Sequence, residues 1–321
     1  MSSVLVTGGL GVNGAPVLEA LVRKGVRPVV VDTRHDLSLV DAETQAGIEV
    51  IIGDFTDEAL IAPLLRREGM KAVIHMAALV GNAQEMPLEA FRVNAYGTAF
   101  LLDLAQRCGV RRFVFTSTRG VYGEQPGAAA HPTYKPIHED DPVRPYGVYD
   151  VCKVAAEGLC RNIARAHPEM EFIALRFATI FAPGKALRHK NYGILSEIIE
   201  GGVSGRPVNI SQGGDQKDDL IYVADVADAI VLAAFCPKPR HDVYNIATGV
   251  GVTLNDLADA VRKIAPEADI KIGPGLNYMQ WPTNYSGVLD ATRAAEDLGF
   301  RTRYDLATAV ADYVKRYRSM A

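Results

Sequence analysis

Tyr149 and Lys153 stand four residues apart in the segment PYGVYDVCKVAAE, residues 145–157, and together they could move a proton. On a helix, residues at this spacing lie on the same face. A phenol ordinarily keeps its proton until about pH 10, so Tyr149 needs a nearby cation to act as a base at neutral pH. Lys153 can be that cation. Many ordinary helices carry such a pair, so its interpretation depends on the rest of the chain.

The composition is typical of a folded protein that acts on small molecules. With 321 residues the chain can form two domains or one large one. The net charge of −4 gives no signature of nucleic-acid or anionic-membrane binding. The sequence predicts neither a signal peptide nor a membrane span, because its first apolar run is broken by glycines and no long apolar run follows. The cysteines and histidines show no metal-ligand spacing, so we expect no metal and reduced thiols in a cytoplasmic protein.

A glycine-rich loop near the N-terminus has the spacing of a dinucleotide-binding turn. Residues 4–6 form a short apolar strand signal, residues 7–14 follow directly, and a helical pattern begins next. Glycines at positions 8, 11 and 14 allow a tight turn, close approach of the backbone to a pyrophosphate, and close packing of helix on strand. The N-terminus of the following helix favours phosphate charge. This order of elements predicts a bound dinucleotide.

The choice between the two common dinucleotides depends on the end of the next expected strand. Asp32 ends that strand, about twenty residues after the glycine loop. Its carboxylate can accept hydrogen bonds from both ribose hydroxyls, and it would repel a 2′-phosphate. Arg34 is the nearby feature that favours NADP. We expect NAD as the cofactor, with NADP as the alternative.

Short apolar runs alternate with helical patterns along the chain. This repetition predicts a parallel sheet, and right-handed crossovers make it doubly wound. The expected strands lie at residues 4–6, 28–31, 48–52, 72–76, 112–116, 172–177, 207–210, 220–223 and 243–246. The predicted fold class is α/β, a Rossmann-type doubly wound parallel sheet with a smaller C-terminal α/β substrate-binding lid.

The periodicity weakens beyond the sixth expected strand, which indicates a second domain. We expect an NAD-binding Rossmann domain at 1–180 and 217–248, and a smaller substrate-binding domain at 181–216 and 249–321. The segment 124–145 is rich in proline, glycine and alanine, and we expect it to form a flap over the site. Ligands bind at the carboxyl ends of parallel strands, so the hydroxyls that follow the fifth strand should lie beside the cofactor.

Together these motifs resemble the extended short-chain dehydrogenase/reductase family, the NAD-dependent epimerase/dehydratase group, along nearly the whole chain. One match would mean little, but several occur in the family's own order. They are residues 7–14 (T-G-G-x-G-x-x-G), 53–54 (the adenine-contacting strand end), 75–78 (H-x-A-A), Asn94 (N-x-x-G-T), 117–123 (S-[ST]-x-x-V-Y-G), 149–153 (Y-x-x-x-K) and 219–223 (R-D-F-I-Y-V without the arginine).

The resemblance implies a role for each matched residue. Tyr149 would be the acid/base, Lys153 would bind nicotinamide-ribose hydroxyls and lower the Tyr149 pKa, and Thr118 would bind the reacting oxygen. The implied cofactor site is Gly8, Gly11, Val12, Asn13, Gly14, Asp32, Asp54, Phe55, Ala77, Ala78, Asn94, Thr116, Tyr149, Lys153 and Phe177. The implied substrate site is Val80, Asn82, Thr118, Arg119, Thr179 and Asn191. Helices near 88–107 and 149–167 pair in many relatives, which implies a homodimer.

Three departures from the family pattern bear on the substrate. Asp218 takes the place of the arginine that usually binds the substrate's pyrophosphate, and a carboxylate would repel that group. Thr179 replaces a substrate-contacting asparagine, and Arg119 begins the segment where dehydratases carry an Asp-Glu pair. We expect an NAD-dependent oxidoreductase acting on a secondary alcohol of a small sugar, sugar acid or polyol. The alternatives are a nucleotide-sugar (UDP-sugar type) 4-epimerase and a non-catalytic NAD-sensing regulator.

Overall fold

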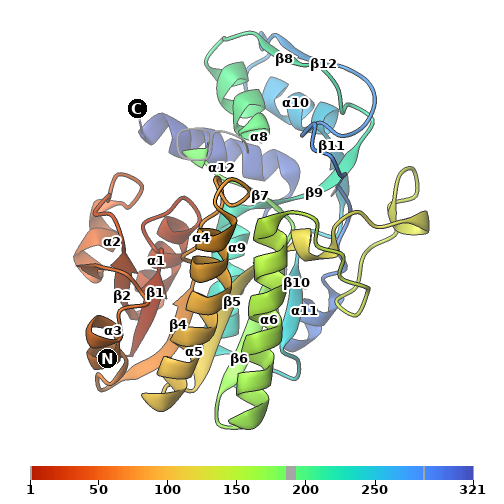
Figure 1. The fold of residues 1–321 in the computed structure, drawn as a ribbon. Coiled ribbons are helices and arrows are strands. Elements are labelled where there is room, and N and C mark those ends of the chain that lie inside the picture. The colour runs from red at the N-terminus through yellow and green to blue at the C-terminus, as the bar shows by residue number, and fades with distance from the viewer. Residues whose placement is uncertain (1, 186–192, 285, 321) are drawn as a thin grey trace.

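A seven-stranded parallel sheet lies at the centre of the computed structural model, which describes residues 2–185, 193–284 and 286–320 (Figure 1). Most strands are buried on both faces, as their continuous apolar runs require. The strands lie in the order β10 (Val243–Ile246), β6 (Glu171–Phe177), β5 (Arg112–Thr118), β4 (Met70–His75), β1 (Ser3–Thr7), β2 (Arg27–Asp32) and β3 (Glu49–Ile52). The chain reverses direction across the sheet between β1 and β4, where such folds bind ligands.

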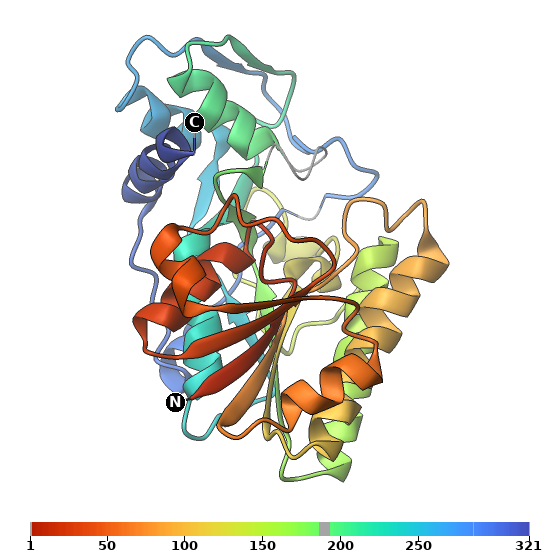
Figure 2. The same cartoon turned by 90° about the vertical axis from the view of Figure 1, so that its left-hand side faces the viewer.

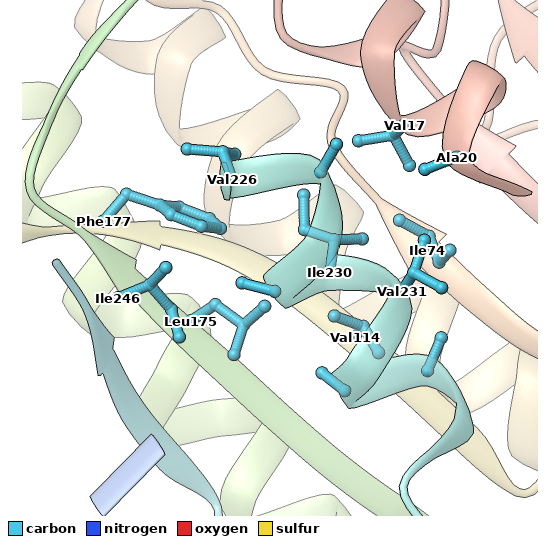
Figure 3. Packing of buried hydrophobic residues seen from close by; sticks show 14 of the residues in the cluster. Val17, Ala20, Ile74, Val114, Leu175, Phe177, Val226, Ile230, Val231 and Ile246 are labelled. Carbon is cyan, nitrogen blue, oxygen red and sulfur yellow. The ribbon is translucent and has the colours of Figure 1, made fainter. Parts of the chain in front are cut away.

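Helices cover both faces of this sheet (Figure 2). α1 (Gly14–Arg23) and α9 (Val223–Phe235) share one face. α3 (Glu58–Leu65), α5 (Gly97–Arg107) and α6 (Val148–Ala166) share the other. α9 is apolar around most of its circumference because it packs both against the sheet and against the neighbouring α1, and Figure 3 shows Ile230 among residues of β4, β5 and β6. The doubly wound α/β fold predicted from the sequence is confirmed.

A smaller body of structure lies beyond the carboxyl ends of the main strands and has its own apolar cluster. It contains a three-stranded sheet, β11 (Gly251–Thr253), β9 (Lys217–Tyr222) and β7 (Thr179–Phe181), and a two-stranded sheet, β12 (Ile270–Ile272) and β8 (Val208–Ile210). Its helices are α8 (Ile194–Ser196), η5 (Glu197–Gly201), α10 (Leu254–Arg262) and α12 (Leu306–Ser319). The strand expected at 220–223 therefore pairs in the smaller body, whereas α9, which follows it, packs on the main sheet.

The remaining elements are short connections. They are α2 (Ala42–Gly47), α4 (Pro87–Phe91), η1 (Arg92–Tyr96), η2 (Arg119–Tyr122), η3 (Gly127–Ala129) and α11 (Thr292–Asp297). α4, η1 and α5 run on without a break, so the helix near 88–107 that the family resemblance implies is present with a π-helical turn inside it. None of the helices in the described ranges is long and apolar enough to cross a bilayer.

The expected flap at 124–145 does not cover the site. Ile137 pairs with Leu289 and its N–H donates to the carbonyl of Val288. The Glu139 carboxylate accepts the backbone N–H of Asn245 in β10 at 2.8 Å. These bonds hold the segment against β10 and the C-terminal part of the chain, and none of its described residues lines the main cavity. The prediction was wrong because composition identifies a loop but not the surface on which it packs.

Candidate active site

One large cavity lies at the carboxyl ends of the central strands. Its volume is about 1200 Å³, above the usual range for a single drug-sized ligand, so a dinucleotide and a second molecule can occupy it together. It is lined by the residues that end or follow the strands: Gly8 after β1, Asp32 in β2, Ala77 after β4, Thr118 in β5 and Phe177 in β6. The topology therefore gathers at one place residues that are far apart in the sequence.

The glycine loop forms one wall of the cavity, and at Gly8 and Gly14 its backbone leaves no room for a side chain. Gly8 has φ +68°, and a Cβ there would lie 2.7 Å from the Ala77 Cα. A Cβ at Gly14 would lie 2.4 Å from the Gly9 carbonyl oxygen. In the same loop the buried Oδ1 of Asn13 has no hydrogen-bond partner among the described residues. A loop of this shape with an unsatisfied acceptor fits a bound dinucleotide, whose hydroxyls can donate to that oxygen.

Asp32 lies at the end of the cavity that would hold the adenosine. Its Oδ2 accepts the N–H of Leu10 at 3.2 Å, and its Oδ1 accepts the N–H of Arg34 at 3.3 Å. These bonds hold the carboxylate at the cavity edge and leave further lone pairs free for ribose hydroxyls. Arg34 is exposed and also lines the cavity, so its cation is the feature here that would suit a 2′-phosphate. The arrangement favours two hydroxyls over a 2′-phosphate.

Nearly every residue of the implied cofactor site lines this cavity, and Asn94 is the exception. The Asn94 side chain is buried in η1, where its Oδ1 accepts the N–H of Leu79 and its Nδ2 donates to the Leu79 carbonyl, both at 2.8 Å. Leu79 itself lines the cavity. We therefore interpret Asn94 as a positioning residue for the segment after β4. The N-x-x-G-T motif identifies the position but carries no signal about the direction of the side chain.

Tyr149, Lys153 and Thr118 all line the same cavity, although Thr118 belongs to a different element. Lys153 is 1% exposed, and its Nζ donates to the carbonyl oxygen of Thr116 at 2.7 Å. The same nitrogen lies 5.4 Å from the centre of the half-buried Tyr149 ring. Burial lowers the pKa of Lys153 to about 7, and the Glu157 carboxylate opposes that change. The sequence spacing of Tyr149 and Lys153 thus places both on the cavity side of α6.

A buried polar network fixes α6 to the end of β5, and the sequence analysis missed it. The Ser117 hydroxyl donates to Glu157 Oε1 at 2.5 Å, and Arg176 Nη2 donates to Glu157 Oε2 at 2.6 Å. Arg176 also donates to the Tyr122 hydroxyl at 3.0 Å. Burying this set without partners would be costly, but every charge has its counterpart. The one sequence signal was Glu157, four residues after Lys153 on the same helix face.

Only some of the expected substrate residues line the cavity. Val80, Thr118, Arg119 and Thr179 line the cavity, whereas Asn82 is exposed and does not. Asn191 lies outside the described residues. No group of histidine, cysteine, aspartate or glutamate side chains in the described ranges could hold a metal ion.

Asp218 is not the free negative charge that the sequence suggested. It is 2% exposed, forms an ion pair with Arg119, and accepts the hydroxyls of Thr179 and Tyr278, both at 2.8 Å. Lys217 is exposed, and neither Lys217 nor Asp218 lines the cavity. Asp218 is therefore not an unpaired carboxylate that would repel a substrate pyrophosphate, and that expectation was wrong. Its partner Arg119 is 99 residues away in sequence, so adjacency in the chain gave no sign of the pair.

The parallel sheet, the glycine loop and the Tyr149–Lys153 pair define a dinucleotide-dependent enzyme of the extended short-chain dehydrogenase/reductase type. The family model described as "NAD dependent epimerase/dehydratase family" matches residues 4–247. The chain belongs to that family, which confirms the resemblance seen in the motifs, and its cofactor is NAD.

Several proteins are similar to this chain over nearly its whole length. The UDP-glucose 4-epimerase of Mycolicibacterium smegmatis is 31% identical over 98% of each chain. The crystal structure of UDP-glucose 4-epimerase with UDP-glucose from Thermotoga maritima has a TM-score of 0.83 at 27% identity and covers 99% of each chain. The Thermus thermophilus UDP-glucose 4-epimerase in complex with NAD has a TM-score of 0.81 at 26% identity, covering 99% of this chain and 100% of its own. These comparisons support the epimerase alternative better than the expected oxidation of a small free substrate.

Proposed function

We propose that this enzyme is an NAD-dependent 4-epimerase of a UDP-sugar. The observation that carries the proposal is that Thr118, Tyr149 and Lys153 line the same cavity as the glycine loop. A cavity of this size accommodates a substrate beside the cofactor. The similarity to UDP-glucose 4-epimerases over nearly the whole chain supports the choice of substrate.

In the proposed reaction, Tyr149 removes the proton of the sugar's 4-hydroxyl and later returns it. Lys153 favours the phenolate while it is charged, and Thr118 holds the reacting oxygen. NAD, when bound, accepts the hydride of the same carbon and gives it back to the opposite face. The hydrogen bonds among Ser117, Glu157 and Arg176 hold α6 in place against β5. The two catalytic side chains on α6 and the threonine on β5 are therefore kept in position around one carbon.

The rest of the site follows as part of the proposal. The cavity-lining members of the implied cofactor set would hold NAD, and Val80, Thr118, Arg119 and Thr179 would contact the sugar. The two parts of the chain, 1–180 with 217–248 and 181–216 with 249–321, would act as cofactor and substrate domains. The regulator hypothesis has no support in the site, since the acid/base residue, its cation and the hydroxyl are all present.

Net oxidation of a small acidic sugar is the second candidate, and one observation favours it. Arg119 directly follows Thr118, the residue that would hold the reacting oxygen, and also lines the cavity, so it places a cation there that could bind an acidic group. An enzyme that epimerises leaves the cofactor unchanged overall, whereas a dehydrogenase accumulates NADH.

One assay separates the two candidates. Incubation with UDP-glucose, followed by chromatography of the nucleotide sugars and absorbance of NADH, should show UDP-galactose formed without net reduction of NAD. Accumulation of NADH on a free sugar or sugar acid, with UDP-sugars left unchanged, would contradict the proposal.

We also propose that the protein is a cytoplasmic homodimer. All four cysteines are free thiols, which suits a reducing compartment. Large apolar side chains are exposed along α4, η1 and α6, the helices that pair in the dimers of many relatives. They include Leu88, Phe91, Tyr96, Val151 and Leu159.

A further inference from the structure

Arg119 is a cavity residue whose charge the proposed reaction does not use. It directly follows Thr118 and begins η2, so its backbone position is tied to the end of β5. The side chain is 14% exposed and lines the cavity. A guanidinium next to the group that holds the reacting oxygen lies where it can contact a substituent of the substrate.

The ion pair with Asp218 holds this guanidinium in place. Arg119 donates through Nη1 to Asp218 Oδ1 and, at 3.5 Å, to the carbonyl of Gly287. The Asp218 carboxylate is itself held by the hydroxyls of Thr179 and Tyr278. It also accepts the N–H of Asp219 at 3.0 Å. Because the carboxylate is held by these other donors, the ion pair fixes the Arg119 side chain, and little side-chain entropy is left to lose on binding.

The rest of the guanidinium has donors to offer. Arginine carries five N–H groups, and Arg119 uses only those on Nη1 within the described part of the chain. Within the described residues, neither Nε nor Nη2 is a buried nitrogen without a hydrogen-bond partner. This agrees with both nitrogens facing the cavity that Arg119 lines. Two parallel N–H groups of a fixed guanidinium are the usual partner of a carboxylate, which they bind in a bidentate manner.

We propose that Arg119 is a specificity residue that binds a carboxylate on the sugar carbon next to the reacting one, so the preferred substrate is a uronic acid. This inference rests on the proposed function, because Thr118 marks the reacting oxygen only in that reaction. The carbon beside the reacting carbon carries the sugar's exocyclic group. The carbon that bears the diphosphate lies across the ring, further from Thr118, so a carboxylate is favoured over the diphosphate as the partner of Arg119.

The test compares substrates that differ only in this carboxylate. For wild type and Arg119→Gln, kcat/KM is measured with UDP-glucuronic acid and UDP-glucose as one pair, and with glucuronic acid and glucose plus NAD as a second pair. Wild type should prefer the acid in a pair that it turns over. The Arg119→Gln substitution should reduce that preference roughly ten- to hundredfold, mainly through KM, as expected for loss of one charge-assisted contact.

Two further variants keep the test valid if Arg119→Gln folds poorly. The double variant Arg119→Gln with Asp218→Asn removes both charges, so no buried carboxylate is left unpaired, and it should show the same loss of acid preference. Arg112→Gln is the matched control, because the buried Arg112 forms an ion pair with the partly exposed Glu171 outside the cavity. It should leave the acid-to-neutral ratio as in wild type.

Each outcome decides the matter. The proposal is overturned if the wild type shows no preference for the acid in the pair of substrates that it turns over. It is also overturned if the acid-to-neutral ratio of kcat/KM is unchanged in both Arg119 variants. An equal loss of affinity for UDP itself, measured by calorimetry, also overturns it, since Arg119 would then bind the diphosphate. Acid preference with only the free sugars would support the role of Arg119 while contradicting the UDP-sugar epimerase, so the two proposals can fail separately.

Discussion

The Nζ of Lys153 lies 2.7 Å from the carbonyl oxygen of Thr116, to which it donates a hydrogen bond. This contact joins the second turn of α6 to the end of β5, the two elements that carry Tyr149 and Thr118. It also takes the ammonium group out of water, since Lys153 is 1% exposed. Correct placement of the catalytic groups therefore depends on burying a cation, and that burial is measurable.

The Lys153→Met variant should change how stability depends on pH. Burial lowers the Lys153 pKa from 10.5 to about 7, so between these values the unfolded chain binds more protons than the folded one. Stability from this group therefore rises with pH across that window, by at most about 1.4 kcal/mol per pH unit. Urea unfolding of the cofactor-free protein at pH 7 to 9 should show a smaller slope in the variant. The same slope in both proteins would contradict the buried cation, and Lys217→Met at an exposed site is the control.

The Asp32→Asn variant should lose most of its preference for NAD. In the wild type we expect NAD to bind at least roughly tenfold more tightly than NADP. The Asp32 carboxylate accepts hydrogen bonds from the ribose hydroxyls of NAD, and it repels the 2′-phosphate of NADP. The asparagine removes the repulsion, so the two affinities should approach each other. Calorimetric titration of both cofactors measures the effect. Equal affinities in the wild type would mean that Arg34 offsets Asp32, and Arg34→Ala would then restore the preference.

The Asp218→Arg variant should destabilise the protein. The structure places Asp218 against Arg119, so the substitution buries two like charges and removes the acceptor for Thr179 and Tyr278. Breaking such a buried pair costs about 3–5 kcal/mol. Thermal and urea unfolding should detect this loss, and Asp218→Asn, which keeps hydrogen-bonding capacity, should lose less. Wild-type stability together with new affinity for UDP would show that the pair is not formed.

The Leu159→Asp variant should dissociate the proposed dimer. Leu159 lies on α6 and is 46% exposed, and a carboxylate in an apolar interface would be desolvated without a partner. Light scattering after size-exclusion chromatography should show a dimeric wild type and a monomeric variant. Val250→Asp provides a control, since Val250 is 58% exposed but lies next to β11, away from these helices. A monomeric wild type would exclude the dimer.

The sequence was sufficient to predict the main sheet because its signals are local. Apolar runs set the strands, the glycines at the first turn fit a backbone that a Cβ would obstruct, and helical spacing put Tyr149 and Lys153 on one face. The three-residue strands β7, β11 and β12 were missed, whereas β8, of the same length, was expected at 207–210. Helices α11 and α12 were not predicted either.

The substrate half of the site could not be predicted for a different reason. The charge state of the pocket depends on which residues far apart in the chain meet in space, and Arg119 at the start of η2 meets Asp218 in β9 only in the folded structure. Asn94 likewise binds Leu79 instead of facing the cavity. Motifs identify such positions without giving the direction of the side chain.

The most direct test of the proposed function follows the hydrogen on the reacting carbon. The enzyme is incubated with UDP-glucose deuterated at C4, and the product is examined by NMR while NADH is followed by absorbance. If the hydride leaves and returns within one active site, UDP-galactose should form with the deuterium retained at C4 and no net NADH. Tyr149→Phe should slow this conversion by about 10²–10⁴-fold while still binding NAD. Deuterium that accumulates in reduced cofactor beside an oxidised sugar would contradict the account.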